Sequence, residues 1–119
     1  MTLNEYQEQA MTTCMATSNS FTYMMLNLMG EVGEFASKVA KGIRKNFLLM
    51  TGKGSYIHLA ETPEGFDEDL KKEAGDILWQ LAGLCSVHGW TLEEIAQMNL
   101  AKLASRKERG KIDGDGDNR

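Results

Sequence analysis

One stretch of the chain, residues 20–45, constrains the fold more than any other. Its apolar residues recur every three or four positions, and at about 100° per residue they fall within a stripe roughly 100° wide. They are Phe21, Met24, Met25, Leu28, Val32, Phe35, Val39 and Ile43. An extended strand cannot bring that spacing to one face, so the stretch predicts a long amphipathic helix that buries one side.

Three further stretches carry helical patterns. Residues 3–15 follow Thr2, with Glu5 three positions later, and a helix to about residue 109 follows Thr91, with Glu94 three positions later. Each pair is typical of a capping box. Residues 67–88 carry an apolar stripe and are followed by a glycine suited to end a helix. The chain has 119 residues and one proline, which favours a single all-α domain.

The predicted organisation is one helical domain over residues 1–110 and a polar, glycine-rich tail over residues 111–119. We expect the tail to fray unless another element holds it. Residues 46–65 contain three glycines and the proline, and predict a long loop or a small hairpin. Four helices of this length form only a small bundle. We therefore expect a homodimer or homotetramer whose subunits complete the core.

Composition excludes several classes of function. There are 13 basic and 17 acidic residues, a net charge of −4, which does not suit a protein that coats a nucleic-acid polymer. No apolar run approaches the ~18 residues of a membrane span, and the first residues lack the pattern of a signal peptide. Cys14 and Cys85 stand apart from any metal or redox motif. Reduced thiols in a cytoplasmic protein are the expectation.

The carboxylates of the two long helices form the sharpest candidate site. Glu31 and Glu34 lie three positions apart on the first, and Glu73 and Asp76 three apart on the second. Helical geometry places both pairs beside the apolar stripe on the same rotational side, so antiparallel packing would merge them. Crowded carboxylates repel unless a cation binds, and their oxygens suit Mg²⁺ or Mn²⁺. The alternative interpretation is that they are solvated surface groups.

Three glycines lie inside the predicted helices next to these acids. Gly30, Gly33 and Gly75 each cost roughly 1 kcal/mol relative to alanine in a helix interior. Close approach of the two helices or room for a ligand would explain their positions. The pattern does not separate these two explanations.

The segments 30–34, Gly-Glu-Val-Gly-Glu, and 73–79, Glu-Ala-Gly-Asp-Ile-Leu-Trp, resemble the MazG-like family of all-α nucleoside triphosphate pyrophosphohydrolases. The family pattern is an ExxE on one helix followed by an ExxD on the next. Residues 99–103 and 106–110 add to the likeness, which covers about residues 20–119. The resemblance implies a four-helix, MazG-like bundle. It also implies Mg²⁺-dependent hydrolysis of a nucleoside triphosphate to a monophosphate and pyrophosphate, a housekeeping reaction of the nucleotide pool.

The resemblance also implies roles for individual residues. The metal ligands would be the four carboxylates, with Glu34 in addition orienting the attacking water. The positions implied for substrate contact are Lys38, Asn99, Lys102 and Arg106. Many relatives have a glutamate where this chain has Gly30, so no general base is assigned. The alternative function is a non-catalytic helical module that binds a partner through its methionine-rich face.

Overall fold

The computed structural model describes residues 1–52, 54 and 56–119. Within them the chain forms four α-helices, a single 3-10 turn and a two-stranded antiparallel sheet. In chain order the elements are α1 (Leu3–Met11), η1 (Ala16–Ser18), α2 (Phe21–Arg44), β1 (Leu48–Met50), β2 (Tyr56–His58), α3 (Phe66–Val87) and α4 (Leu92–Glu108). The prediction of an all-α fold is confirmed, and the long loop carries the small hairpin.

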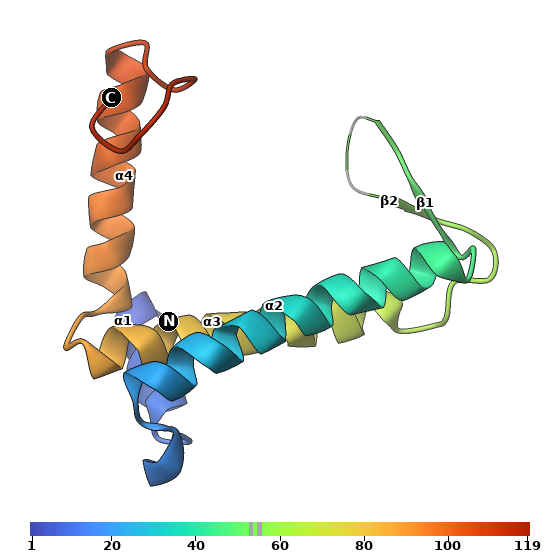
Figure 1. Ribbon diagram of the computed structural model, residues 1–119, viewed down its shortest axis with the longest axis horizontal. Helices are drawn as coiled ribbons and strands as arrows, with labels where there is room; N and C mark the ends of the chain where they lie inside the picture. The colour runs from blue at the N-terminus through green and yellow to red at the C-terminus, as the bar shows by residue number, and fades with distance from the viewer. Residues whose placement is uncertain (53, 55) are drawn as a thin grey trace.

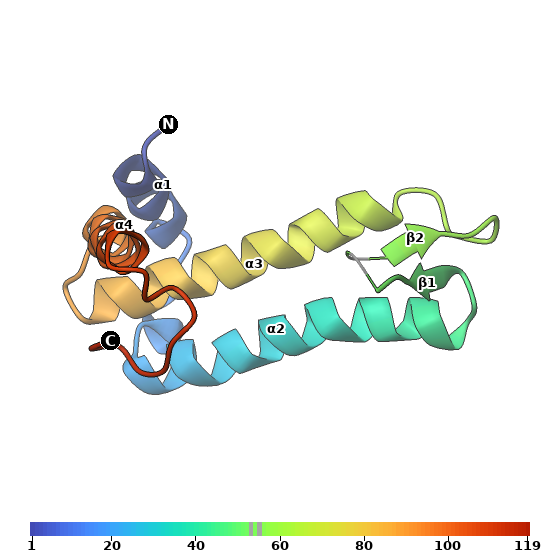
Figure 2. The same ribbon diagram turned by 90° about the horizontal axis from the view of Figure 1, so that it is seen from above.

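The long helices α2 and α3 run side by side in opposite directions and form the centre of the molecule (Figure 2). Met24 of α2 is almost completely buried, and a Cβ placed on Gly83 of α3 would collide with its side chain. This glycine therefore lets the two helices approach closely at that level. Ser20 caps the N-terminus of α2, because its hydroxyl accepts a hydrogen bond from the Tyr23 amide at 3.1 Å.

Helices α1 and α4 meet the end of α3 that carries its C-terminus (Figure 1). The buried side chain of Gln7 joins the three helices. Its Nε2 donates to Ser86 Oγ and to the Trp90 carbonyl, and its Oε1 accepts from the Leu92 amide at 2.8 Å. The capping boxes predicted at the starts of α1 and α4 are both present. A small apolar cluster of Ala82, Cys85 and Leu92 lies beside this junction.

The hairpin covers the opposite end of the α2–α3 pair. Leu48 pairs with His58 and Met50 with Tyr56 in the antiparallel register. Phe47 and Leu48 are buried, and both lie so close to Gly42 that a side chain there would collide with them. The end of α2 is thereby packed against the start of the hairpin.

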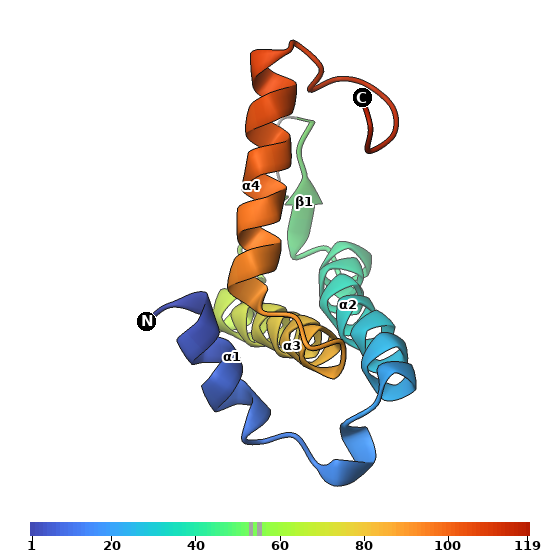
Figure 3. The same ribbon diagram turned by 90° about the vertical axis from the view of Figure 1, so that its left-hand side faces the viewer.

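The chain is less compact than a typical domain of the same length. Its radius of gyration is 17.8 Å, whereas a compact domain of this size has about 14 Å. Its accessible surface of 8516 Å² exceeds by roughly 2,100 Å² the value typical of a monomer of this mass. Helix α4 and the hairpin rise from the same side of the α2–α3 pair at opposite ends (Figures 1 and 3). Large apolar side chains stay exposed, among them Leu26 at 70% and Met98 at 68%.

Some local expectations need correction. Helix α1 ends at Met11 rather than near residue 15, because the chain turns there into η1. A Cβ added at Gly33 or Gly75 would meet nothing within 4 Å, and one at Gly30 only Asn27 Oδ1 at 3.7 Å. Within this chain these glycines do not mark close helix packing. Among the described residues, no helix has the length and apolar character needed to cross a membrane.

Candidate metal centre

Three of the predicted carboxylates converge midway along the α2–α3 pair. Glu31 of α2 and Glu73 and Asp76 of α3 each offer an oxygen, and these oxygens all lie within 4.8 Å of one another. Antiparallel packing of the two helices brings them together, as their helical spacing predicts. Glu31 and Glu73 are half-buried and Asp76 is exposed, so the group faces solvent on one side.

The charges in this group are not balanced. Burial raises the pKa of Glu31 above its usual value, and the nearby carboxylates of Glu34, Asp76 and Glu73 raise it further. One opposing contact comes from Asn27, whose Nδ2 donates to Glu31 Oε1 at 3.1 Å and stabilises the ionised form. A raised carboxyl pKa means that the folded chain disfavours the charge there, so a bound cation would relieve the repulsion.

Lys38 lies beside the carboxylates, as expected of a residue near the substrate. Its Nζ is 3.2 Å from Glu73 Oε1, and the Glu73 side chain is only 14% exposed. This ion pair supplies one positive charge to a group of three acids. Lys38 therefore remains close enough to meet an anionic ligand held at the same place.

Glu34 is exposed and lies outside the group of three converging oxygens. It is still near, since its charge contributes to the raised pKa of Glu31. Its position three residues beyond Glu31 places it one step further around α2. The assignment of Glu34 as a metal ligand or water-orienting group stays a prediction.

The three predicted substrate residues of α4 lie elsewhere in this chain. Helix α4 stands away from the middle of the α2–α3 pair (Figure 1). Asn99 and Lys102 line a shallow hollow on α4, together with Ile95 and Met98. A single chain therefore does not bring Asn99, Lys102 and Arg106 to the carboxylates.

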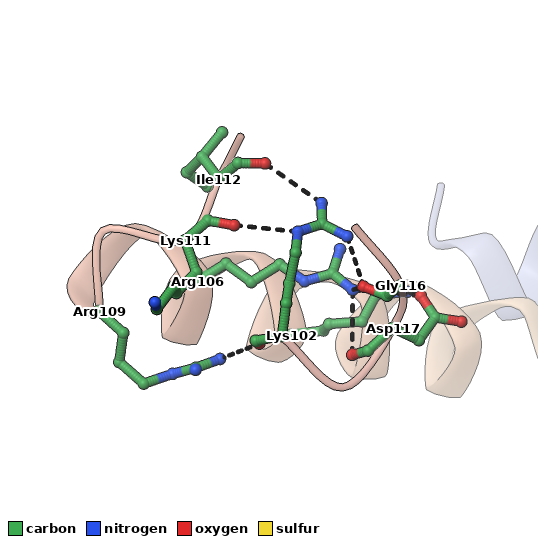
Figure 4. A network of polar contacts seen from close by, with 8 residues as sticks. Lys102, Arg106, Arg109, Lys111, Ile112, Gly116 and Asp117 are labelled. Atoms are coloured by element: carbon green, nitrogen blue, oxygen red, sulfur yellow. Dashed lines mark hydrogen bonds and ion pairs between the residues drawn. The ribbon is translucent and has the colours of Figure 1, made fainter. Parts of the chain in front are cut away.

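Arg106 is instead held by the tail (Figure 4). Its side chain is 7% exposed, and its Nη2 lies 3.1 Å from Asp117 Oδ1 and donates also to the Gly116 and Asp117 carbonyls. Lys102 Nζ lies 3.2 Å from the same carboxylate. Arg119 donates to three tail carbonyls. The bonds from Arg106 and Lys102 join the tail to α4, which is the kind of contact that would keep it from fraying.

Trp79, His88 and Trp90, which could also have contacted a ligand, have structural partners. Trp79 Nε1 donates to the Ala10 carbonyl at 3.1 Å and to Thr13 Oγ1 at 2.9 Å, which fastens α1 to α3. His88 Nδ1 lies 2.8 Å from the Leu84 carbonyl, and its ring stacks on Trp90 at 4.3 Å. Sequence reasoning missed Asn27, although its spacing four residues before Glu31 could have identified it.

The arrangement suits a hard divalent cation. All converging donors are carboxylate oxygens, the donor type preferred by Mg²⁺ and Mn²⁺, and the group has no histidine or cysteine that would favour zinc. The group also holds three carboxylates with one lysine beside them, and a cation would offset that negative charge. The residues present therefore fit a divalent metal.

Comparison with known proteins agrees with this chemistry. The model of the MazG nucleotide pyrophosphohydrolase domain matches residues 19–110. The chain is also 38% identical over 98 residues to the Gene 37 protein of Mycobacterium phage L5, covering 82% of this chain and 75% of that protein. The name of that relative states no activity. No solved structure matches the chain.

Proposed function

The chain belongs to the MazG nucleotide pyrophosphohydrolase family, and we propose that it hydrolyses a nucleoside triphosphate to a nucleoside monophosphate and pyrophosphate. The observation that carries the proposal is the convergence of Glu31, Glu73 and Asp76 within 4.8 Å. Members of this family typically depend on a divalent metal. The two unpaired cysteines suit the reducing cytoplasm, where nucleotide pools are found.

The chain supplies groups for each requirement of the reaction. Glu31, Glu73 and Asp76 would hold Mg²⁺, and Mn²⁺ would fit the same oxygens. The metal, when bound, supplies charge neutralisation for the phosphates and polarises the phosphoryl group under attack. Lys38 would bind a phosphate oxygen in place of Glu73, since its ammonium group already lies 3.2 Å from that metal-binding candidate. Glu34, which is free of the tight group, would orient the water.

We also propose that the active protein is a homodimer or homotetramer. If two copies each covered their roughly 2,100 Å² of excess surface, the interface would fall in the range of obligate dimers. The exposed apolar residues of α2 and α4 supply the contact surface. A second copy could also bring Asn99, Lys102 and Arg106 of its α4 to the carboxylates. Light scattering at micromolar concentration tests the assembly, and a stable, active monomer would contradict it.

The reaction is tested by incubating the protein with a panel of ribonucleoside and deoxyribonucleoside triphosphates, with and without Mg²⁺. We expect pyrophosphate and a monophosphate as products, and only in the presence of the metal. Orthophosphate as the sole inorganic product would defeat the proposal. Turnover of no nucleotide would favour the alternative, a helical module that binds a partner protein. The exposed side chains of Leu26 and Met98 are compatible with that alternative.

A further inference from the structure

A cavity of about 540 Å³ lies next to the carboxylates, where the C-terminal part of α2, the start of α3 and the loop between them meet. Pockets for small organic ligands have a similar size. Lys38, which pairs with Glu73, also lines this cavity. Lys38 therefore links the cavity to the group that would hold the phosphates.

A row of lysines leads from the carboxylates along one wall. Lys38, Lys41 and Lys45 follow at spacings of three and four, so they share one face at the end of α2. Seven residues of helix span about 10 Å. A ligand with phosphates beside Lys38 would extend its sugar and base over this distance, toward the loop.

The far wall is aromatic. The Phe47 and Phe66 rings meet edge to face, with centroids 5.6 Å apart, and Pro63 lies beside them. Phe47 is buried, whereas Phe66 is half-buried and keeps part of its ring accessible. Tyr56 and His58 contact the Phe66 ring and hold it in place. A fixed, partly open aromatic ring is a suitable surface for stacking a planar base.

The charges of the cavity argue against a ligand made of phosphate alone. Three acids, Glu61, Glu64 and Asp69, line it together with the three lysines. They would repel a bare polyphosphate, yet their oxygens can accept hydrogen bonds from amino groups on the edge of a base. The lining thus combines a stacking surface, hydrogen-bond acceptors and a lysine row.

We propose that this cavity holds the ribose and base of the nucleotide, with Phe66 as the stacking residue and the acids as acceptors for an amino-bearing base. The proposal rests on the proposed function, because it assigns the phosphates to the neighbouring carboxylates. It places base selection in Phe47, in residues 61–64 of the loop and at the start of α3.

Nuclear magnetic resonance titration of the whole protein without metal tests the cavity directly. Cytidine and uridine monophosphates serve as probes. We expect amide shifts clustered in residues 38–47 and 59–69, and several-fold tighter binding of cytidine, which has an amino group where uridine has a carbonyl. Shifts confined to other parts of the chain would overturn the pocket, and equal affinities would overturn the role of the acids.

The variant Phe66→Leu keeps an apolar side chain but removes the ring. We expect it to weaken cytidine monophosphate binding about tenfold, as loss of one base–aromatic stack does. The KM for the triphosphate should rise similarly while kcat changes little. The control Trp90→Leu removes an exposed ring between α3 and α4, outside the cavity, and should change neither constant. An unchanged KM in Phe66→Leu would refute the stacking role.

The two proposals fail in distinguishable ways. Binding of the monophosphate in the cavity, with no hydrolysis of any triphosphate, would refute the proposed reaction and leave the pocket standing. Hydrolysis by an enzyme whose titration shifts avoid the cavity would refute the pocket alone.

Discussion

Two charged regions of this molecule differ in how their charge is satisfied. The carboxylates of Glu31, Glu73 and Asp76 have one cationic partner nearby, Lys38, and repulsion contributes to the raised pKa of Glu31. Two cations of α4, Lys102 and Arg106, pair with the tail: Arg106 Nη2 contacts three oxygen atoms of Gly116 and Asp117, although its buried Nε has no partner among the described residues. Among the residues that the structure describes, the first region therefore keeps excess negative charge, whereas the tail supplies acceptors for the cations of the second.

The difference shows why a charged cluster has to be judged by its partners. Sequence spacing marks both regions equally, as acids at i, i+3 and as bases at i, i+4. Among the described residues the acids keep the larger imbalance, three carboxylates to one lysine, whereas Lys102 and Arg106 share the single carboxylate of Asp117. A charged ligand binds with more favourable free energy at a cluster of opposite charge whose charge the protein has not already neutralised.

The largest expected effect comes from Asp76→Asn. Losing one metal ligand should reduce turnover at least a thousandfold, while removal of a repelling charge leaves the metal-free protein as stable or more so, by about 1 kcal/mol. Mg²⁺ should raise the midpoint of thermal unfolding by several degrees in the wild type and much less in the variant, because binding to the native state adds stability.

Glu68→Gln is the matched control for Asp76→Asn. Glu68 is an exposed acid on the same helix whose ion pair is with Lys71, at 2.8 Å. It should keep both activity and the Mg²⁺ response. Equal Mg²⁺ responses in wild type and Asp76→Asn would show that this carboxylate is not a ligand. A large loss of stability without metal would make it a structural group.

Glu34→Gln should have the next largest effect and separates two roles. If Glu34 orients the water from outside the converging group, turnover falls about a hundredfold or more, the usual contribution of a positioned base. The Mg²⁺-induced rise in unfolding midpoint should then be largely kept. Loss of that rise, to the extent seen in Asp76→Asn, would instead make Glu34 a fourth ligand.

A smaller effect on stability is expected where the cations of α4 meet the tail. Arg106→Ala removes the buried donor of the tail bonds, and we expect a loss of about 1 kcal/mol because the exposed tail oxygens can return to water. Hydrogen exchange should accelerate in residues 111–119 and not in α2. Lys107→Ala, on the same turn of α4, is the control. Continued protection of the tail amides would show that other contacts hold it.

The smallest expected effect is the response of the tail to low pH. Hydrogen bonds from Lys102 and Arg106 lower the pKa of Asp117 below its usual 3.8. The ion pair therefore contributes stability above about pH 3.8, and this is lost as the pH falls through the lowered pKa. Tail amide resonances should shift in that acidic range in the wild type and not in Asp117→Asn. A transition near or above pH 3.8 would contradict the pairing.

Much of this molecule is determined by local sequence. The spacing of apolar residues and the capping pairs Thr2–Glu5 and Thr91–Glu94 define the helices to within a few residues, because these signals act within a turn of chain. The acid pairs could also be predicted, since helical geometry alone places Glu73 and Asp76 on one face. The acids of α2 could be paired with them as well, because they lie on the same rotational side of the apolar stripe of their own helix.

Tertiary structure decided what depends on distant residues. The close approach of α2 and α3 occurs at Gly83, against Met24, and not at the glycines beside the acids, because an open or crowded Cβ position is set by the neighbouring helix. The same holds for Arg106, whose partner Asp117 lies in a tail that composition alone predicts to fray. Periodicity gives the direction of a side chain, whereas what it meets is determined only when the chain has folded.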